Sequence, residues 1–153
     1  MAPIKIKLVG FDEPLVQELV AANMRDLSER YGGSGDDTPI RAADFLPPSG
    51  AFFVAEGPDG RLLASAGWRR HGDDAELKRM FTLAEARGQG VARRMLATIE
   101  ESARAAGCNR VILETGDRQP EAIALYESAG YTRIDDFGYY AGYDDVLSYA
   151  KDL

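Results

Sequence analysis

The chain has 153 residues, 45% of them hydrophobic, and a formal net charge of -7. This length suits one domain with one core, so we expect a single domain over residues 1–153. The negative charge argues against a nucleic-acid partner, which would require clustered Lys and Arg. The sequence shows no leader pattern at its start and no stretch of about 18 apolar residues. We therefore expect a cytoplasmic protein with no membrane partner.

Cys108 is the only cysteine and His71 the only histidine. A single residue of each type cannot form an intramolecular disulfide or the usual Cys/His metal cluster, so we expect no metal. A catalytic pair of the two remains open, but Cys108 lies where an amphipathic helix meets an apolar strand, the usual place for a buried thiol. His71 stands in a turn-forming segment, which favours exposure to solvent.

The first half of the chain predicts one helix among four strands. Alternating apolar and charged residues predict a strand over 4–9, and helical spacing then predicts a helix that Asp12 caps and that runs to Arg30. Glycine and aspartate over 32–39 indicate a loop. Further strands are predicted over 52–56, 62–68 and 76–83, and their short connections make them an antiparallel meander.

The second half predicts helices and strands in alternation. Apolar residues at helical spacing follow Gly90, and Gly107 stands where this helix should stop. A buried strand follows over 111–113, then a helix over about 120–129 and strands over 131–134 and 146–149. The fold class is therefore α/β (α+β), with a mixed, mostly antiparallel sheet of about seven strands and helices on both faces.

A glycine-bearing turn joins the fourth predicted strand to the second predicted helix. Gly88 and Gly90 allow the backbone to approach a ligand closely, and free N–H groups at a helix N-terminus attract anions. The nearby Arg87, Arg93 and Arg94 add positive charge in an otherwise acidic chain. The turn therefore indicates an anion site, although a connection that merely starts a helix is the alternative.

Two other phosphate-binding motifs can be tested against this turn. A Walker loop requires Gly-x-x-x-x-Gly-Lys-Ser/Thr, which the sequence does not contain. A dinucleotide fingerprint fits Gly88 and Gly90 but has Arg93 at its third glycine position. A nucleotide-binding oxidoreductase therefore remains only as a less favoured alternative.

The string Arg87-x-x-Gly90-x-Ala92 resembles the signature of the GCN5-related N-acetyltransferase (GNAT) superfamily, which places it between the fourth strand and the following helix. A second block, from Glu114 to Tyr131, is also similar to that superfamily. Together the similarities cover roughly residues 50 to 135. They imply the GNAT fold, acetyl-CoA as cosubstrate without a metal, and an amine of a small molecule or peptide as acceptor. The protein would be a monomer or homodimer.

The resemblance also implies which residues hold the cosubstrate. In the family, the end of the fourth strand offers backbone groups to the pantetheine arm, and the turn holds the pyrophosphate. Many members carry Asn where Gln119 stands. The positions implied here are Met80, Phe81, Thr82, Arg87, Gly88, Gln89, Gly90, Val91, Ala92, Arg93 and Gln119.

Two catalytic roles follow from the same resemblance. Tyr126 matches a tyrosine that protonates the departing CoA thiolate, although a buried tyrosine of the core is the alternative. Glu76 matches the general-base glutamate of the histone-acetylating members, although a surface glutamate or a base acting through water is equally compatible. His71 is the other candidate base, on its ordinary pKa alone.

The acceptor site is implied to lie between two loop regions, residues 27–48 and 137–145. Asp36, Asp37, Asp144 and Asp145 are candidates to attract a cation, and Tyr139, Tyr140 and Tyr143 are candidates to pack on an apolar body. A noncatalytic acyl-CoA-binding sensor is the alternative to an enzyme. Such a sensor would bury the thiol end without an open second cleft.

Overall fold

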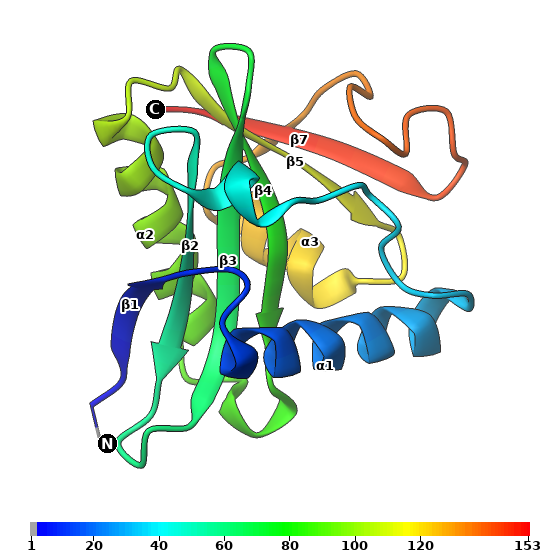
Figure 1. Cartoon of the computed structure of the whole chain (residues 1–153). Helices are drawn as coiled ribbons and strands as arrows, with labels where there is room; N and C mark the ends of the chain where they lie inside the picture. The colour runs from blue at the N-terminus through cyan, green and yellow to red at the C-terminus, as the bar shows by residue number, and fades with distance from the viewer. Residues whose placement is uncertain (1–2) are drawn as a thin grey trace.

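A seven-stranded sheet with strand order β1-β2-β3-β4-β5-β7-β6 forms the centre of residues 3–153, the part of the chain that the computed structural model describes (Figure 1). The predicted mixed sheet is confirmed, because β4 and β5 are parallel and every other neighbouring pair is antiparallel. The strands are β1 (Lys5–Val9), β2 (Gly50–Glu56), β3 (Leu62–His71), β4 (Asp74–Thr82), β5 (Arg110–Gly116), β6 (Thr132–Arg133) and β7 (Val146–Asp152).

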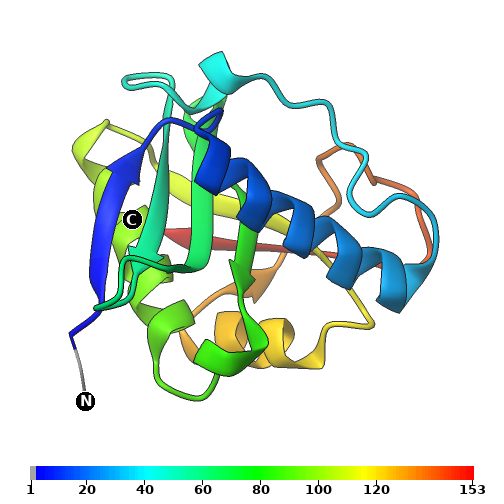
Figure 2. The same cartoon turned by 60° about the horizontal axis from the view of Figure 1, so that its bottom comes forward.

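Helices cover both faces of the sheet, as predicted. The helices are α1 (Pro14–Tyr31), α2 (Val91–Ala105) and α3 (Pro120–Ser128), with short 3-10 helices η1 (Ala42–Phe45) and η2 (Ala84–Ala86). Figure 1 shows α1 in front of the sheet and α2 and α3 behind it, and Figure 2 shows the same layers from below. The sheet therefore separates two cores. One packs α1 on Phe52, and the larger one packs Met95 of α2 and Tyr126 of α3 on Trp68.

The start of α1 differs from the prediction in one residue. The N-cap is Glu13, not Asp12: its backbone is extended and its side chain caps no N–H of the helix. The Glu13 carboxylate instead accepts a 2.6 Å hydrogen bond from the Gly10 N–H. Pro14 then occupies the first helical position, where its missing N–H is not needed. Within residues 3–153, none of the helices is both long and apolar enough to cross a bilayer.

The parallel strands β4 and β5 separate soon after they meet. They pair at Ala75↔Val111 and Glu76↔Ile112, and beyond this point β5 runs away from β4 (Figure 1). β4 is also irregular in its pairing with β3, in the segment opposite Ser65 to Gly67. The far half of β4 therefore lacks a neighbour on its β5 side, and a wedge opens between the two strands.

Candidate active site

Two adjoining cavities lie at the wedge between β4 and β5. The first, called the turn cavity, has a volume of about 310 Å³ and is lined by the turn before α2, the end of β4, and parts of α1 and α3. The second, called the loop cavity, has a volume of about 270 Å³ and lies between α1, β4, β5 and the loops at 32–41 and 134–145. The residues that line both are Asn23, Met80, Gln119 and Tyr126.

Backbone donors line the turn cavity. Gly88 and Gly90 have φ values of +78° and +77°, a left-handed conformation that favours glycine. Within residues 3–153, the N–H groups of residues 88–93 form no backbone hydrogen bond, because they precede or begin α2. A Cβ placed on either glycine would meet no atom within 4 Å. The turn therefore presents free donors to open space at the positive end of a helix dipole, which suits an anion.

Arginine side chains add charge around these donors. Arg87 donates from Nε to the Thr82 carbonyl oxygen at 3.0 Å, and Arg93 donates to the Ser128 hydroxyl at 2.7 Å. Both arginines line the turn cavity. Arg94 does not, because its guanidinium donates to the Ile4 carbonyl oxygen. The predicted three-arginine cluster is therefore reduced to two.

A further arginine reaches the turn cavity from a distant segment. Arg30, in the last turn of α1, lines the cavity and forms ion pairs with Asp26 and Glu121. Its distance in sequence from the turn explains why sequence reasoning missed it. Arg30 reaches the turn cavity only because α1 packs across the sheet.

Tyr126 stands where the two cavities meet. Its side chain comes from α3, is 5% exposed, and packs beside the rings of Tyr131 and Tyr149 at centroid distances of 5.8 and 6.5 Å. In the described part of the chain its hydroxyl has no hydrogen-bond partner. Burial raises the pKa of Tyr126 well above its usual range, so the phenol stays protonated. A weak acid with an unused proton therefore faces the junction.

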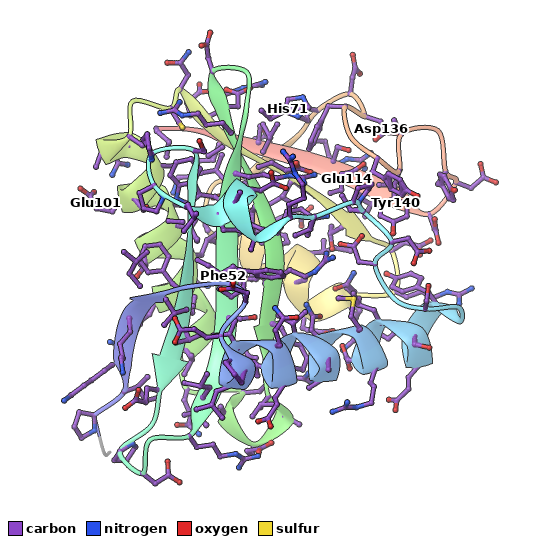
Figure 3. The ribbon with its side chains drawn as sticks, in the orientation of Figure 1. Phe52, His71, Glu101, Glu114, Asp136 and Tyr140 are labelled. Carbon is purple, nitrogen blue, oxygen red and sulfur yellow. The ribbon has the colours of Figure 1, made fainter. Side chains whose placement is uncertain are left out.

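Glu114 supplies a carboxylate to the loop cavity. Its Oε2 accepts the Tyr140 backbone N–H at 3.0 Å (Figure 3), whereas its Oε1 is buried and has no hydrogen-bond partner within residues 3–153. Burial is the main cause of the raised pKa of Glu114, and the charges of Glu76 and Asp36 add to it, while Lys78 and the Tyr140 N–H oppose it. The carboxylate therefore combines a raised proton affinity with a free oxygen atom.

An ion cluster also lines the loop cavity. Asp36 accepts hydrogen bonds from Lys78 Nζ at 2.9 Å and from Arg79 at 2.5 Å. The Tyr140 hydroxyl donates to Asp36 at 3.0 Å and accepts the Asp37 N–H at 2.7 Å. Tyr140 thereby ties together the two loop regions that were expected to form the walls of an acceptor site.

The sequence model of the Acetyltransferase (GNAT) family matches residues 16–131. The chain belongs to this family. It is 30% identical over 147 residues, covering 88% of this chain and 84% of the relative, to the uncharacterized N-acetyltransferase YjgM of Escherichia coli. An IAA acetyltransferase of Azospirillum brasilense is 46% identical over 69 residues, which are 45% of each chain.

The fold agrees with that of solved GNAT proteins. A GNAT-family acetyltransferase from Staphylococcus aureus superposes with a TM-score of 0.81 over 99% of both chains, at 18% identity. The predicted GNAT fold is therefore confirmed by both sequence and structure.

The positions expected to hold the GNAT cosubstrate gather in one place, with one exception. Ten of the eleven line the turn cavity: Met80, Phe81, Thr82, Arg87, Gly88, Gly90, Val91, Ala92, Arg93 and Gln119. Gln89 does not, because its side chain turns back and donates to the Glu85 carbonyl oxygen at 3.4 Å.

Glu76, the base expected from the GNAT resemblance, lies elsewhere. Its side chain is buried and accepts a 3.0 Å hydrogen bond from Arg69, its cross-strand partner on β3. It lines neither cavity, because the segment of β4 that carries it is still paired with β5. The structure therefore gives no support to Glu76 as the base. His71, the other candidate base, packs its ring on Phe137 and also lines neither cavity.

The acidic residues expected to attract a cationic acceptor divide into two groups. Asp36 and Asp145 line the loop cavity, whereas Asp37 and Asp144 do not. Burial opposes the ionisation of Asp36, but Lys78 and Arg79 outweigh it and hold the pKa of Asp36 well below its usual range. Asp36 is thus already paired with two cations. Among the tyrosines, Tyr140 and Tyr143 line the cavity.

Proposed function

We propose that this GNAT-family chain transfers the acetyl group of acetyl-CoA to an amine of a small molecule or peptide. The observation that carries the proposal is the meeting of two cavities at Tyr126, one lined by an anion-binding turn and the other by the free carboxylate oxygen of Glu114. A noncatalytic acyl-CoA sensor would need only the turn cavity. The second cavity, with a candidate base in its wall, therefore favours an enzyme over a sensor.

The residues of the turn cavity fit the chemistry of a CoA ester. The free N–H groups of residues 88–93, with Arg87 and Arg93, suit a pyrophosphate. The edge of β4 from Met80 to Thr82, which β5 has left, offers unpaired backbone groups to an amide-containing arm, in the way that a sheet edge accepts an added strand. Acetyl-CoA supplies an activated thioester to this arrangement.

The two acid–base groups have separate tasks in the proposed reaction. Glu114 accepts a proton from the acceptor ammonium group, and the neutral nitrogen forms a bond to the acetyl carbon as the carbon–sulfur bond breaks. Tyr126 gives its proton to the departing sulfur, and the second proton that the nitrogen loses as it becomes the amide nitrogen passes to the Tyr126 tyrosinate. The protonated Glu114 then releases its proton to solvent. A free amine is protonated at neutral pH and must lose a proton before it attacks. A carboxylate with a raised pKa, such as that of Glu114, accepts this proton more readily than a carboxylate with the usual pKa. A positioned acid or base contributes about 10²- to 10⁴-fold to a rate.

Two measurements test the proposal. Thiol release from acetyl-CoA, followed across a panel of primary amines, should rise above the rate of hydrolysis for at least one amine. Thermal unfolding should shift upward with CoA and not with NAD. Stabilisation by NAD alone would instead identify a nucleotide-binding protein. Stabilisation by CoA with no thiol release from any amine would identify a sensor.

A further inference from the structure

Two cations of the loop cavity pair with the same carboxylate, that of Asp36. Lys78 and Arg79 both pair with this one carboxylate, and their side chains are only 6% and 7% exposed. Lys78 also donates to the Thr38 hydroxyl, which is neutral. Within residues 3–153, Asp36 is the only carboxylate at ion-pair distance from Lys78 and Arg79, and Lys78 acts on the Glu114 carboxylate only at longer range. The two cations can therefore bind a further anionic group that enters the cavity.

Besides the Tyr126 hydroxyl, two fully buried side-chain atoms lack hydrogen-bond partners within residues 3–153, and both belong to residues that line this cavity. One is the Nε donor of Arg79 and the other is the Oε1 acceptor of Glu114. Buried polar groups are nearly always hydrogen-bonded, so each unpaired one requires an explanation. A ligand that satisfies both atoms must carry an acceptor group, best an anion, and an N–H donor.

The backbone directs Arg79 into the cavity at some cost. Successive side chains of a regular strand point to opposite faces, yet Lys78 and its neighbour Arg79 both line the loop cavity and both bind Asp36. The irregularity of β4 produces this, and Arg79 there has φ +57°, a left-handed conformation that is uncommon outside glycine. Strained backbone conformations are concentrated at functional sites, where the function requires one side chain to point in a particular direction.

We propose that the acceptor is an amine that itself carries a carboxylate, such as a free amino acid. Its carboxylate binds Arg79 and Lys78, and its amino group meets Glu114, beside Tyr126. Arginine and carboxylate form the strong, charge-assisted hydrogen bonds that such recognition requires. Leu27, Tyr31 and Tyr143 supply apolar surface for the rest of the molecule. This inference rests on the proposed acetyl transfer.

Matched triples of acceptors test the carboxylate directly. Each triple contains an amino acid, its amide and its decarboxylated amine, for one aromatic, one aliphatic and one basic side chain. With acetyl-CoA saturating, we expect the best amino acid to exceed its two analogues in kcat/KM by at least about 100-fold, because a site built to bind a polar group rejects the analogue that lacks it. Equal or faster acetylation of the amides or decarboxylated amines overturns the inference and leaves acetyl transfer standing.

Binding measured without catalysis separates this inference from the proposed function. If CoA binds but no amine gives thiol release, the proposed function has failed. Calorimetric titration of the same amino acids into the CoA-bound protein then decides the inference alone. Absence of binding, or equal binding of the decarboxylated amines, overturns it.

Substitution of Arg79 tests the residue. Arg79→Asn removes the guanidinium and keeps a side chain that tolerates positive φ. We expect the preference for the amino acid over the decarboxylated amine to fall to within about threefold, mainly through KM. Arg110→Asn is the matched control, because Arg110 also pairs with a carboxylate, Asp74, but lines neither cavity. Its preference should match that of the unaltered protein.

A second variant keeps the test decisive if Arg79→Asn does not fold. Arg79→Lys retains the positive charge and loses the Nε donor and the planar fork. We expect it to lower the preference for the amino acid about tenfold, the effect of one strong hydrogen bond. CoA-induced thermal stabilisation reports whether each variant is folded. A folded Arg79 variant that keeps the full preference overturns the assignment.

Discussion

The turn cavity and the loop cavity are built in different ways. The turn cavity takes most of its lining from one stretch of chain, residues 80–93, and its proposed ligand groups are largely backbone N–H. The loop cavity joins side chains that are far apart in sequence, such as Asp36 and Tyr140, which are 104 residues apart. A site made of backbone depends on local conformation and tolerates varied side chains. A site made of side chains depends on the whole fold and on each residue identity.

The largest effect should come from the side-chain site. Glu114→Gln removes the proposed base and keeps the shape of the side chain, so we expect kcat to fall by about 10²- to 10⁴-fold. In the unaltered protein, kcat/KM should rise with pH as Glu114 loses its proton, with the midpoint above the usual pKa of 4.5 because burial raises it. Initial rates from pH 5 to 9 would show both effects, and CoA affinity should stay the same.

Glu76→Gln is the matched control for this prediction. Glu76 is a buried glutamate of the adjacent strand that lines neither cavity, so its substitution should change kcat much less than Glu114→Gln does. A greater loss of kcat in folded Glu76→Gln than in Glu114→Gln would place the base on β4. The loop cavity would then lose its catalytic role.

The junction between the cavities should give the next largest effect. Tyr126→Phe removes the hydroxyl and retains the ring, so kcat should fall by roughly 10- to 1000-fold with little change in CoA affinity. The hydroxyl has no hydrogen-bond partner in the described residues, so its removal should not destabilise the protein. Steady-state kinetics and thermal unfolding test both statements. A kcat within about twofold of normal would make Tyr126 a residue of the core.

These differences explain what the sequence could predict. The order of helices and strands along the chain and the glycine turn were predictable, because hydrophobic periodicity and a short motif specify local structure. The turn residues therefore gather as expected, apart from Gln89, whose side chain turns away from the cavity. The N-cap differs from the prediction, because the pattern favours Asp12, whereas Glu13 occupies the position through its extended backbone with no side-chain cap hydrogen bond.

The loop cavity was predictable only as a location. The resemblance indicated two loop regions, and residues of both line this cavity, but it did not indicate the pairing of Asp36 with Lys78 and Arg79, which depends on an irregular strand. Glu114 was assigned no role, because a glutamate at the end of an apolar strand does not reveal whether it faces a cavity. The one available signal was its position within the block that resembles the GNAT superfamily.

A smaller effect on CoA binding is expected from substitution of the glycine before α2, but not from substitution of the glycine that follows it. Gly90→Val places a branched side chain in the turn cavity, where we expect the Kd for CoA to rise by about 10- to 100-fold, or about 1.4 to 2.8 kcal/mol. Gly107→Val is the control, because Gly107 has a similar φ of +84°, also has open space around a Cβ, and follows the other end of the helix. Backbone strain should therefore destabilise both variants alike, by roughly 1–2 kcal/mol.

Calorimetric titration with CoA separates strain from binding in this pair. Weak CoA binding by Gly90→Val and normal binding by Gly107→Val would assign the effect to the turn cavity. Equal affinities in the two variants would show that the pyrophosphate binds elsewhere, and the contrast between a backbone site and a side-chain site would no longer hold.

The smallest effect is on stability and comes from the loop cavity, through the ionisation of Glu114. Glu114 has a folded-state pKa raised above the usual 4.5, chiefly by burial, so between these two values the folded protein binds more protons than the unfolded chain. Its ionisation therefore lowers stability as pH rises through that window. Glu114→Gln cannot ionise, so its Tm at pH 8 should be higher than that of the unaltered protein.

The difference in Tm should shrink as the pH falls through this window and vanish below about pH 4.5, where Glu114 is protonated in both the folded and the unfolded state. Asp36 has a lowered pKa, so its contribution is lost only in stronger acid and affects both proteins equally. Glu101→Gln, at an exposed position of α2 (Figure 3), should show no such dependence. Thermal unfolding from pH 4 to 8 tests the prediction, and a lower Tm of Glu114→Gln at pH 8 would mean that the Glu114 carboxylate stabilises the fold, as an ion-paired residue does.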